Sequence, residues 1–161
     1  MGSSPQPPSL ASSRGISPAR CAACDSCGVA ADGKSLIEPV REFLSAPRCA
    51  VLATLSADGA PRQVVLHYTL GEDHVQLNGR SDRGWVTNVR RDPRATLVIH
   101  DQTDYLHYVA IRGVARPLTD GDEALEHAMV QAARYGEDPE NFAGQSRVSF
   151  RLDPDSVYEY R

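Results

Sequence analysis

The chain has 161 residues, 24% of them charged, and a net charge of -4, which fits one soluble domain with a substantial core. This acidic balance, without an extended basic face, gives a nucleic-acid partner no electrostatic support. No apolar run approaches the roughly 20 residues of a membrane helix and no signal-peptide core is visible, so the expected location is the cytoplasm.

Residues 1–34 differ in composition from everything after them. They are rich in Pro, Ser and Ala and hold almost no large apolar residues. Such a segment cannot bury enough surface to offset its ordering entropy. We therefore expect a flexible N-terminal extension (1–34) followed by one folded domain (35–161).

Two motifs in the extension resemble ligand sites. Cys21, Cys24 and Cys27 have a spacing that suits zinc or an iron–sulfur cluster, but Cys49, the remaining cysteine, opens an apolar run and is no convincing fourth ligand. Residues 28–35 match the phosphate-binding pattern G-x-x-x-x-G-K-[ST]. No buried strand precedes that pattern, and the chain does not alternate strands and helices. Neither a metal site nor nucleotide hydrolysis is predicted.

The folded domain is predicted to begin with a helix over Ser35–Ala46, in which Ile37, Val40 and Leu44 share one face and which Pro47 ends. A short second helix opens at Ser81 or Asp82, either of which can cap it, and stops before Pro93. A third helix starts with a capping-box-like pair, Asp120 and Glu123, and ends at Gly136.

Between these helices, branched apolar runs and alternating polarity predict six strands. They cover residues 49–55, 61–68, 74–77, 95–101, 105–116 and 147–153, and a Pro154 turn leads to a short final strand at 157–160. Gly59 supplies the positive φ of a hairpin turn. Gly113, in mid-strand, indicates a bulge or the close approach of another backbone. Short connections favour antiparallel pairing in a small closed barrel flanked by helices.

The residues from Asn78 to Pro93 form the candidate functional stretch. A strand ends in a polar turn and enters a short helix, next to Arg80 and Arg83. The free backbone N–H groups of a helix start, beside two arginines, suit an anion. The alternative is an ordinary capped helix with solvated arginines.

Four segments, in this order, carry a resemblance to a known superfamily. Residues 43–61 resemble the opening of the pyridoxamine 5'-phosphate oxidase-like split-barrel flavin and deazaflavin oxidoreductases. The run N-V-R-R-D-P-R at 88–94 is similar to their N-L-R-R-D-P-R. Residues 108–115 resemble their Y-x-x-I-x-G-x-A strand, and 147–157 their closing P-x-x-V segment. The resemblance implies a six-stranded antiparallel split β-barrel, mainly β with flanking helices.

The branch that the chain resembles uses the deazaflavin coenzyme F-420 in two-electron reductions. It implies a homodimer with a cofactor at each end of the subunit interface, and a reductase that acts on a small organic substrate. FMN as the cofactor is one alternative. A non-catalytic module that binds a flavin or tetrapyrrole is the other.

Carried over by position, the resemblance implies ten cofactor-binding residues. They are Val64, Val65, His67, Asn78, Gly79, Arg80, Ser81, Arg83, Trp85 and Asn88. Residues 78–81, Arg83 and Asn88 match the phosphate pocket, whereas Val64, Val65 and His67 match the strand along the ring system. No catalytic acid or base is predicted, and His67 can equally be a half-exposed strand histidine.

Trp85 departs from the family pattern, because relatives often have Lys or Arg there. The change removes a charge-assisted bond to phosphate. The indole can stack on the cofactor or a neighbouring chain, or anchor a short helix to the core.

Overall fold

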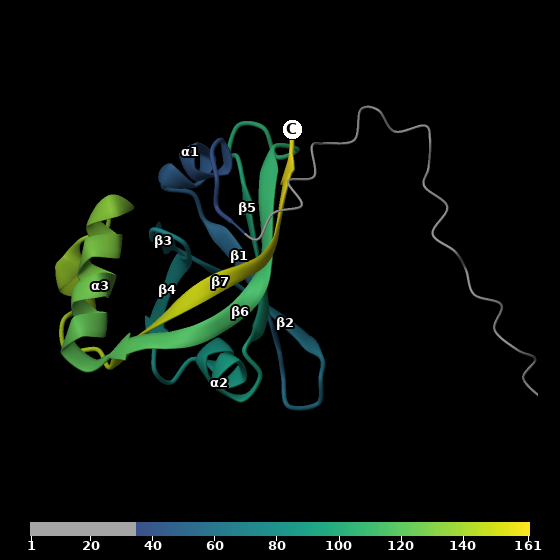
Figure 1. Ribbon diagram of the computed structural model, residues 1–161. Helices are drawn as coiled ribbons and strands as arrows, with labels where there is room; N and C mark the ends of the chain where they lie inside the picture. Colours follow the sequence, from purple (N-terminus) through teal and green to yellow (C-terminus); the bar gives the residue numbers. More distant parts are fainter. Residues whose placement is uncertain (1–34) are drawn as a thin grey trace, which may run out of the picture.

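The structure is a computed structural model that describes residues 35–161 (Figure 1). The three-cysteine motif and residues 28–34 of the glycine-rich motif lie outside the described residues. Among the helices described, none has the length and apolarity to span a membrane.

Seven strands form one antiparallel sheet in the order β2-β1-β5-β6-β7-β4-β3. The strands are β1 (Ala50–Leu55), β2 (Pro61–Leu66), β3 (Tyr68–Leu70), β4 (Val75–Arg80), β5 (Arg94–His100), β6 (Tyr108–Asp120) and β7 (Arg147–Tyr160). The helices are α1 (Val40–Ser45), α2 (Gly84–Arg91), α3 (Gly121–Arg134) and the short 3-10 helix η1 (Pro139–Phe142). Helix α3 covers the sheet beside β4 and β7, whereas α1 and α2 lie at opposite ends of the barrel (Figure 1).

The two edge strands of the sheet, β2 and β3, are consecutive in the chain. Only His67 separates them, although β2 pairs with β1 and β3 pairs with β4. The sheet therefore curls until its two edges meet without pairing, which is a split barrel. The predicted single strand at 61–68 is broken at His67 for this reason, and the sheet has seven strands instead of six.

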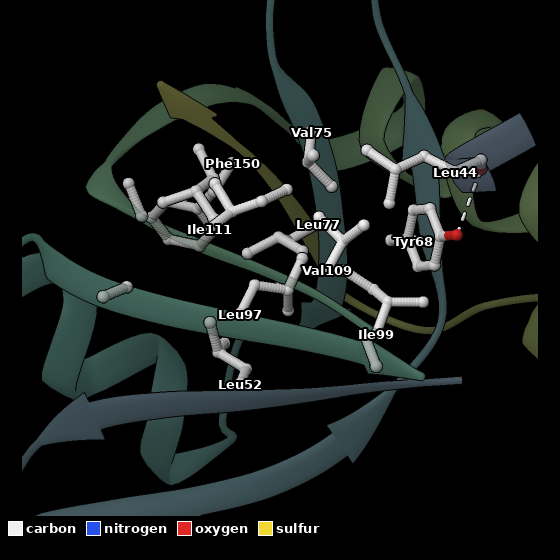
Figure 2. Close-up of a cluster of buried hydrophobic side chains, with 14 of the residues drawn as sticks. Leu44, Leu52, Tyr68, Val75, Leu77, Leu97, Ile99, Val109, Ile111 and Phe150 are labelled. Carbon is white, nitrogen blue, oxygen red and sulfur yellow. Dashed lines mark hydrogen bonds between the residues drawn. The ribbon is translucent and has the colours of Figure 1, made fainter. Parts of the chain in front are cut away.

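Buried side chains of six strands fill the barrel, and the partly buried Val64 and Leu66 of β2 pack against them (Figure 2). Leu52, Leu97, Ile111 and Phe150 are fully buried, and they alternate along their strands with outward residues. Tyr68 joins this core, and its hydroxyl donates to the carbonyl oxygen of Leu44 at 3.0 Å. The core therefore holds α1 against the barrel through one buried hydrogen bond as well as through apolar contact.

Two predicted helix starts, and the predicted cap of a third helix, differ from the structure. Helix α1 begins at Val40, because a proline disfavours helical dihedrals in the residue before it, and Ile37 lies outside the helix and is 56% exposed. Helix α2 begins at Gly84, with no side-chain cap at Arg83. The start of α3 is at the predicted Asp120, but that side chain forms no cap bond.

Gly113 confirms the prediction of a bulge and a close backbone approach. The β6–β7 register shifts between Arg112 and Gly113, and a Cβ at Gly113 would lie 2.0 Å from the carbonyl oxygen of Asp153. Strand β7 absorbs this irregularity at Pro154 and continues to Tyr160. The predicted turn at Pro154 is therefore wrong, because the bulge keeps both strands paired.

Candidate functional site

A cavity of about 520 Å³ opens where the barrel is split. Its walls come from the ends of β2 and β4, the start of α2, and the segment from α3 to β7. Eight of the ten predicted site residues line it. They are Val64, Val65, His67, Asn78, Gly79, Arg80, Arg83 and Trp85.

Three arginines gather on this cavity: Arg80, Arg83 and Arg147. Arg80 and Arg147 are directly opposite each other in the β4–β7 pair, where like charges destabilise a sheet. Arg80 has a carboxylate partner, Asp82, at 2.6 Å. Within residues 35–161, neither Arg83 nor Arg147 has a carboxylate within ion-pair distance. The cluster therefore carries unneutralised positive charge.

Arg147 is the buried member of this cluster, with 8% of its surface exposed. Burial lowers the pKa of its guanidinium, and the nearby charges of Arg80 and Arg83 lower it further. Both effects disfavour the charged form. An anion in the cavity would stabilise the charged guanidinium and so offset both the burial and the repulsion. The surroundings of Arg147 therefore suit a negatively charged ligand.

The start of α2 adds positive potential beside the arginines. Ser81 and Asp82, the two predicted caps, are engaged elsewhere: the Ser81 hydroxyl lies 2.9 Å from that of Ser146, and Asp82 pairs with Arg80. The helix therefore begins without a side-chain acceptor for its first N–H groups. A Cβ at Gly84 would meet no atom within 4 Å, so this helix start is open. An uncapped helix start suits an anion.

Trp85 anchors α2 to the barrel. Its ring meets that of Phe150 edge-on, with 5.6 Å between centroids, and it is 9% exposed. This packing supports the core-anchor interpretation. The same side chain also lines the cavity, so any ligand there lies near the indole.

His67 lies at the break between β2 and β3. Its imidazole stacks on the ring of Tyr135 at 3.8 Å, and its Nδ1 lies 3.9 Å from Glu137 Oε1. Tyr135 is itself fixed, because its hydroxyl donates to the carbonyl oxygen of Arg48 at 2.8 Å. His67 is therefore held in place on the cavity wall beside a carboxylate.

Two predicted residues, Ser81 and Asn88, do not line this cavity. The Asn88 amide donates to Thr54 Oγ1 at 3.1 Å and accepts from Arg91 at 3.1 Å. Asn88 therefore links α2 to the end of β1. Both side chains already have protein partners, so the structure places them beside the site.

Several lining residues were missed from the sequence because they belong to the last turns of α3 and to the segment that follows it. They are Gln131, Ala132, Glu137, Asn141, Phe142, Gln145 and Arg147. Their local sequence carries no motif. Only the pairing of β4 with β7 brings Arg147 to Arg80, and that pairing was not predicted. No group of three or more potential metal ligands occurs within residues 35–161.

Comparisons with known proteins give a family match. The family model described as pyridoxamine 5'-phosphate oxidase matches residues 36–161. No curated protein matches the sequence.

Similar solved structures include an F420 reductase (20% identity, 75% of this chain and 97% of that chain, TM-score 0.63). A conserved hypothetical protein from Mycobacterium tuberculosis is 23% identical over 81% of this chain and 87% of that chain (TM-score 0.65). HutZ, the heme storage protein from Vibrio cholerae, is 18% identical over 78% of this chain and 95% of that chain (TM-score 0.62). At these identities the likeness concerns the fold.

Proposed function

This chain belongs to the pyridoxamine 5'-phosphate oxidase family, and on that premise we propose that it is a reductase that uses coenzyme F-420 to reduce a small organic substrate. FMN in the same cavity is the alternative. The observation that carries the proposal is the buried Arg147, which lies with Arg80 and Arg83 on the cavity and has no carboxylate partner within residues 35–161. A phosphate group is the chemistry that such a cluster fits.

The residues present fit a phosphate-bearing cofactor. Arg83, Arg147 and the open start of α2 would hold its phosphate. Val64, Val65 and His67 would meet its ring system. When bound, the cofactor supplies the hydride. The chain itself would bind and orient the ligand: the arginines would fix one end, and the apolar side chains of β2 would border the other.

The test begins with the absorption spectrum of the purified full-length chain and its titration with F-420, FMN and haem. Trp85 is the only tryptophan, so its fluorescence reports occupancy of the cavity directly. We expect F-420 to bind and Arg83→Gln to weaken that binding. Arg90→Gln is the matched control, because Arg90 is an exposed arginine of α2, the helix that Arg83 precedes, and does not line the cavity.

Each outcome has a consequence. F-420 binding with substrate reduction supports the proposal. A yellow protein with bound FMN moves the assignment to the alternative cofactor. Haem uptake without binding of either F-420 or FMN overturns the reductase assignment and indicates a non-catalytic tetrapyrrole-binding module; the Vibrio cholerae neighbour is named as a heme storage protein.

We also propose that the protein acts as a homodimer. The outward face of the sheet carries one apolar row across five strands: Val65, Val51, Val98, Ala110 and Tyr158 are successive cross-strand partners. Val65, at one end of the row, is 66% exposed and also lines the cavity. A second copy on this row would cover apolar surface and border the cofactor site, which supports the proposal.

A charge at the centre of the row tests the dimer. Val98 points outward from β5, so the fold should survive in Val98→Glu. Sedimentation experiments should then show monomers instead of dimers. Val130→Glu, an exposed valine on α3 outside the row, should leave the dimer intact. A wild-type monomer at all concentrations would contradict the proposal.

A further inference from the structure

We propose that Asn78 is a positioning residue, which with Ser149 and His127 holds Arg147 in place for an anionic ligand. This inference rests on the proposed function, because it concerns the same anion site. It changes the role expected for Asn78 from a direct phosphate contact to a support for the arginine behind it.

The orientation of the Asn78 amide is set by its neighbours. Its Nδ2 lies 2.7 Å from the carbonyl oxygen of Ala124, which can only accept, so the NH₂ group must face that way. The second amide hydrogen goes to Ser149 Oγ at 3.0 Å. Both donors are used inside the protein. The remaining Oδ1 accepts from Arg147 Nε at 2.8 Å.

The chain of hydrogen bonds continues to α3. Because the Ser149 hydroxyl accepts from Asn78, its own hydrogen is available for another acceptor. His127 Nδ1 lies 3.0 Å from Ser149 Oγ and is placed to accept it. Ser149 is fully buried, so an unsatisfied hydroxyl there would be costly. His127 and Ala124 thus both fix Asn78 from α3.

Arg147 needs this support because its surroundings oppose its charge. Arg80 lies directly across the strand pair, and burial adds to the cost. Besides Asn78, the only hydrogen-bond partner of its guanidinium within residues 35–161 is Gln145 Oε1, which accepts from Nη1 at 2.9 Å; the Phe142 ring centroid lies 5.0 Å from Cζ. Nη2 forms no hydrogen bond with the described residues. The oriented guanidinium therefore retains a donor edge for a ligand.

Without Asn78, Arg147 loses the acceptor that faces its Nε, and repulsion from Arg80 favours other side-chain conformations. A purely structural asparagine would lower stability and leave anion affinity unchanged. The two roles therefore separate in a binding measurement on folded protein.

The experiment titrates the full-length chain with inorganic phosphate, followed by Trp85 fluorescence and by NMR of the arginine Nε–H groups. We expect Asn78→Ala to weaken phosphate binding roughly 10- to 100-fold, the range for a lost hydrogen bond to a charged group. The Nε–H of Arg147 should exchange slowly in the wild type and quickly in the variant. Gln76→Ala, at the next outward position of β4 and outside the cavity, should match the wild type in both.

A second pair of variants keeps the test decisive if Asn78→Ala fails to fold. His127→Asn retains an acceptor for the Ser149 hydroxyl and should keep phosphate affinity, whereas His127→Phe removes the acceptor and should weaken binding several-fold. Equal affinity in these two variants would contradict the role of His127.

The outcomes separate this inference from the proposed function. If phosphate binding depends on Asn78 but neither F-420 nor FMN binds, the positioning role holds and the reductase is wrong. If F-420 binds while Asn78→Ala behaves like Gln76→Ala, the positioning role is wrong and the reductase stands. Failure of the wild type to bind phosphate or a phosphate-bearing cofactor overturns both.

Discussion

The indole of Trp85 lies directly against the backbone of Gly79. A Cβ placed on Gly79 would be 2.3 Å from Trp85 Cζ2, a distance that real Cβ contacts essentially never show. Gly79 is thus required because the tryptophan that anchors α2 occupies the space of its missing side chain. The contact links the end of β4 to the start of α2, and both line the cavity.

Replacing Gly79 with alanine should therefore destabilise the protein by about 1–3 kcal/mol, the usual cost of overpacking a core. It should also displace the indole and weaken ligand binding. Gly84→Ala is the control, because a Cβ there meets nothing within 4 Å and alanine favours a helix. Urea denaturation followed by Trp85 fluorescence compares the two. Equal stability of the two variants would refute the contact.

Ionic strength should weaken cofactor binding. Arg83 is exposed and has no ion-pair partner within residues 35–161, so salt screens its attraction for a phosphate. We expect the affinity for F-420, or for FMN if that is the cofactor, to fall several-fold as sodium chloride is raised from low to high concentration. The dependence should be shallower in Arg83→Gln. Salt-independent affinity would show that the arginines do not bind the ligand.

Tyr68 should make the protein sensitive to alkali. Burial raises the pKa of its phenol, so the folded state holds a proton that the unfolded chain releases above the ordinary value of about 10. Stability contributed by Tyr68 is therefore present below pH 10 and is lost as the pH rises beyond it.

The matching variant is Tyr68→Phe, which also loses the hydrogen bonds to the carbonyl oxygens of Leu44 and Ala46. Near neutral pH it should be less stable by about 1 kcal/mol. Above pH 10 its stability should fall less steeply than that of the wild type. Parallel curves of unfolding free energy against pH would argue against a buried phenol.

Asp101 should contribute to acid sensitivity. The Thr103 hydroxyl at 2.6 Å and the Arg48 guanidinium at 2.8 Å hold the pKa of its carboxyl below the usual value of 3.8. Its contribution is present above that value and is lost as the pH falls below it. Asp101→Asn should therefore show a shallower loss of stability between about pH 5 and pH 2 in acid denaturation. Glu126→Gln, at an exposed carboxylate on α3, should retain the wild-type slope.

The sequence alone determined most of the local structure. Branched apolar runs place the β1 and β5 strands to within a residue or two, Gly59 has the positive φ of the predicted hairpin turn, and α2 stops before Pro93. These features depend on side-chain chemistry within a few positions of one another, so they can be read from neighbouring residues. The positive charge of Arg80 and Arg83 at a helix start was also visible in the sequence.

Only the tertiary structure decided where the barrel splits and what completes the site. His67 breaks the single strand predicted at 61–68 because the segments on either side of it pair with different strands, β1 and β4. Arg147 reaches Arg80 because β7 pairs with β4, and Asn78, which the sequence suggested as a ligand, is fully engaged by α3 and β7. These contacts join residues 46 to 71 positions apart. Long-range pairing sets them, and no local pattern encodes it.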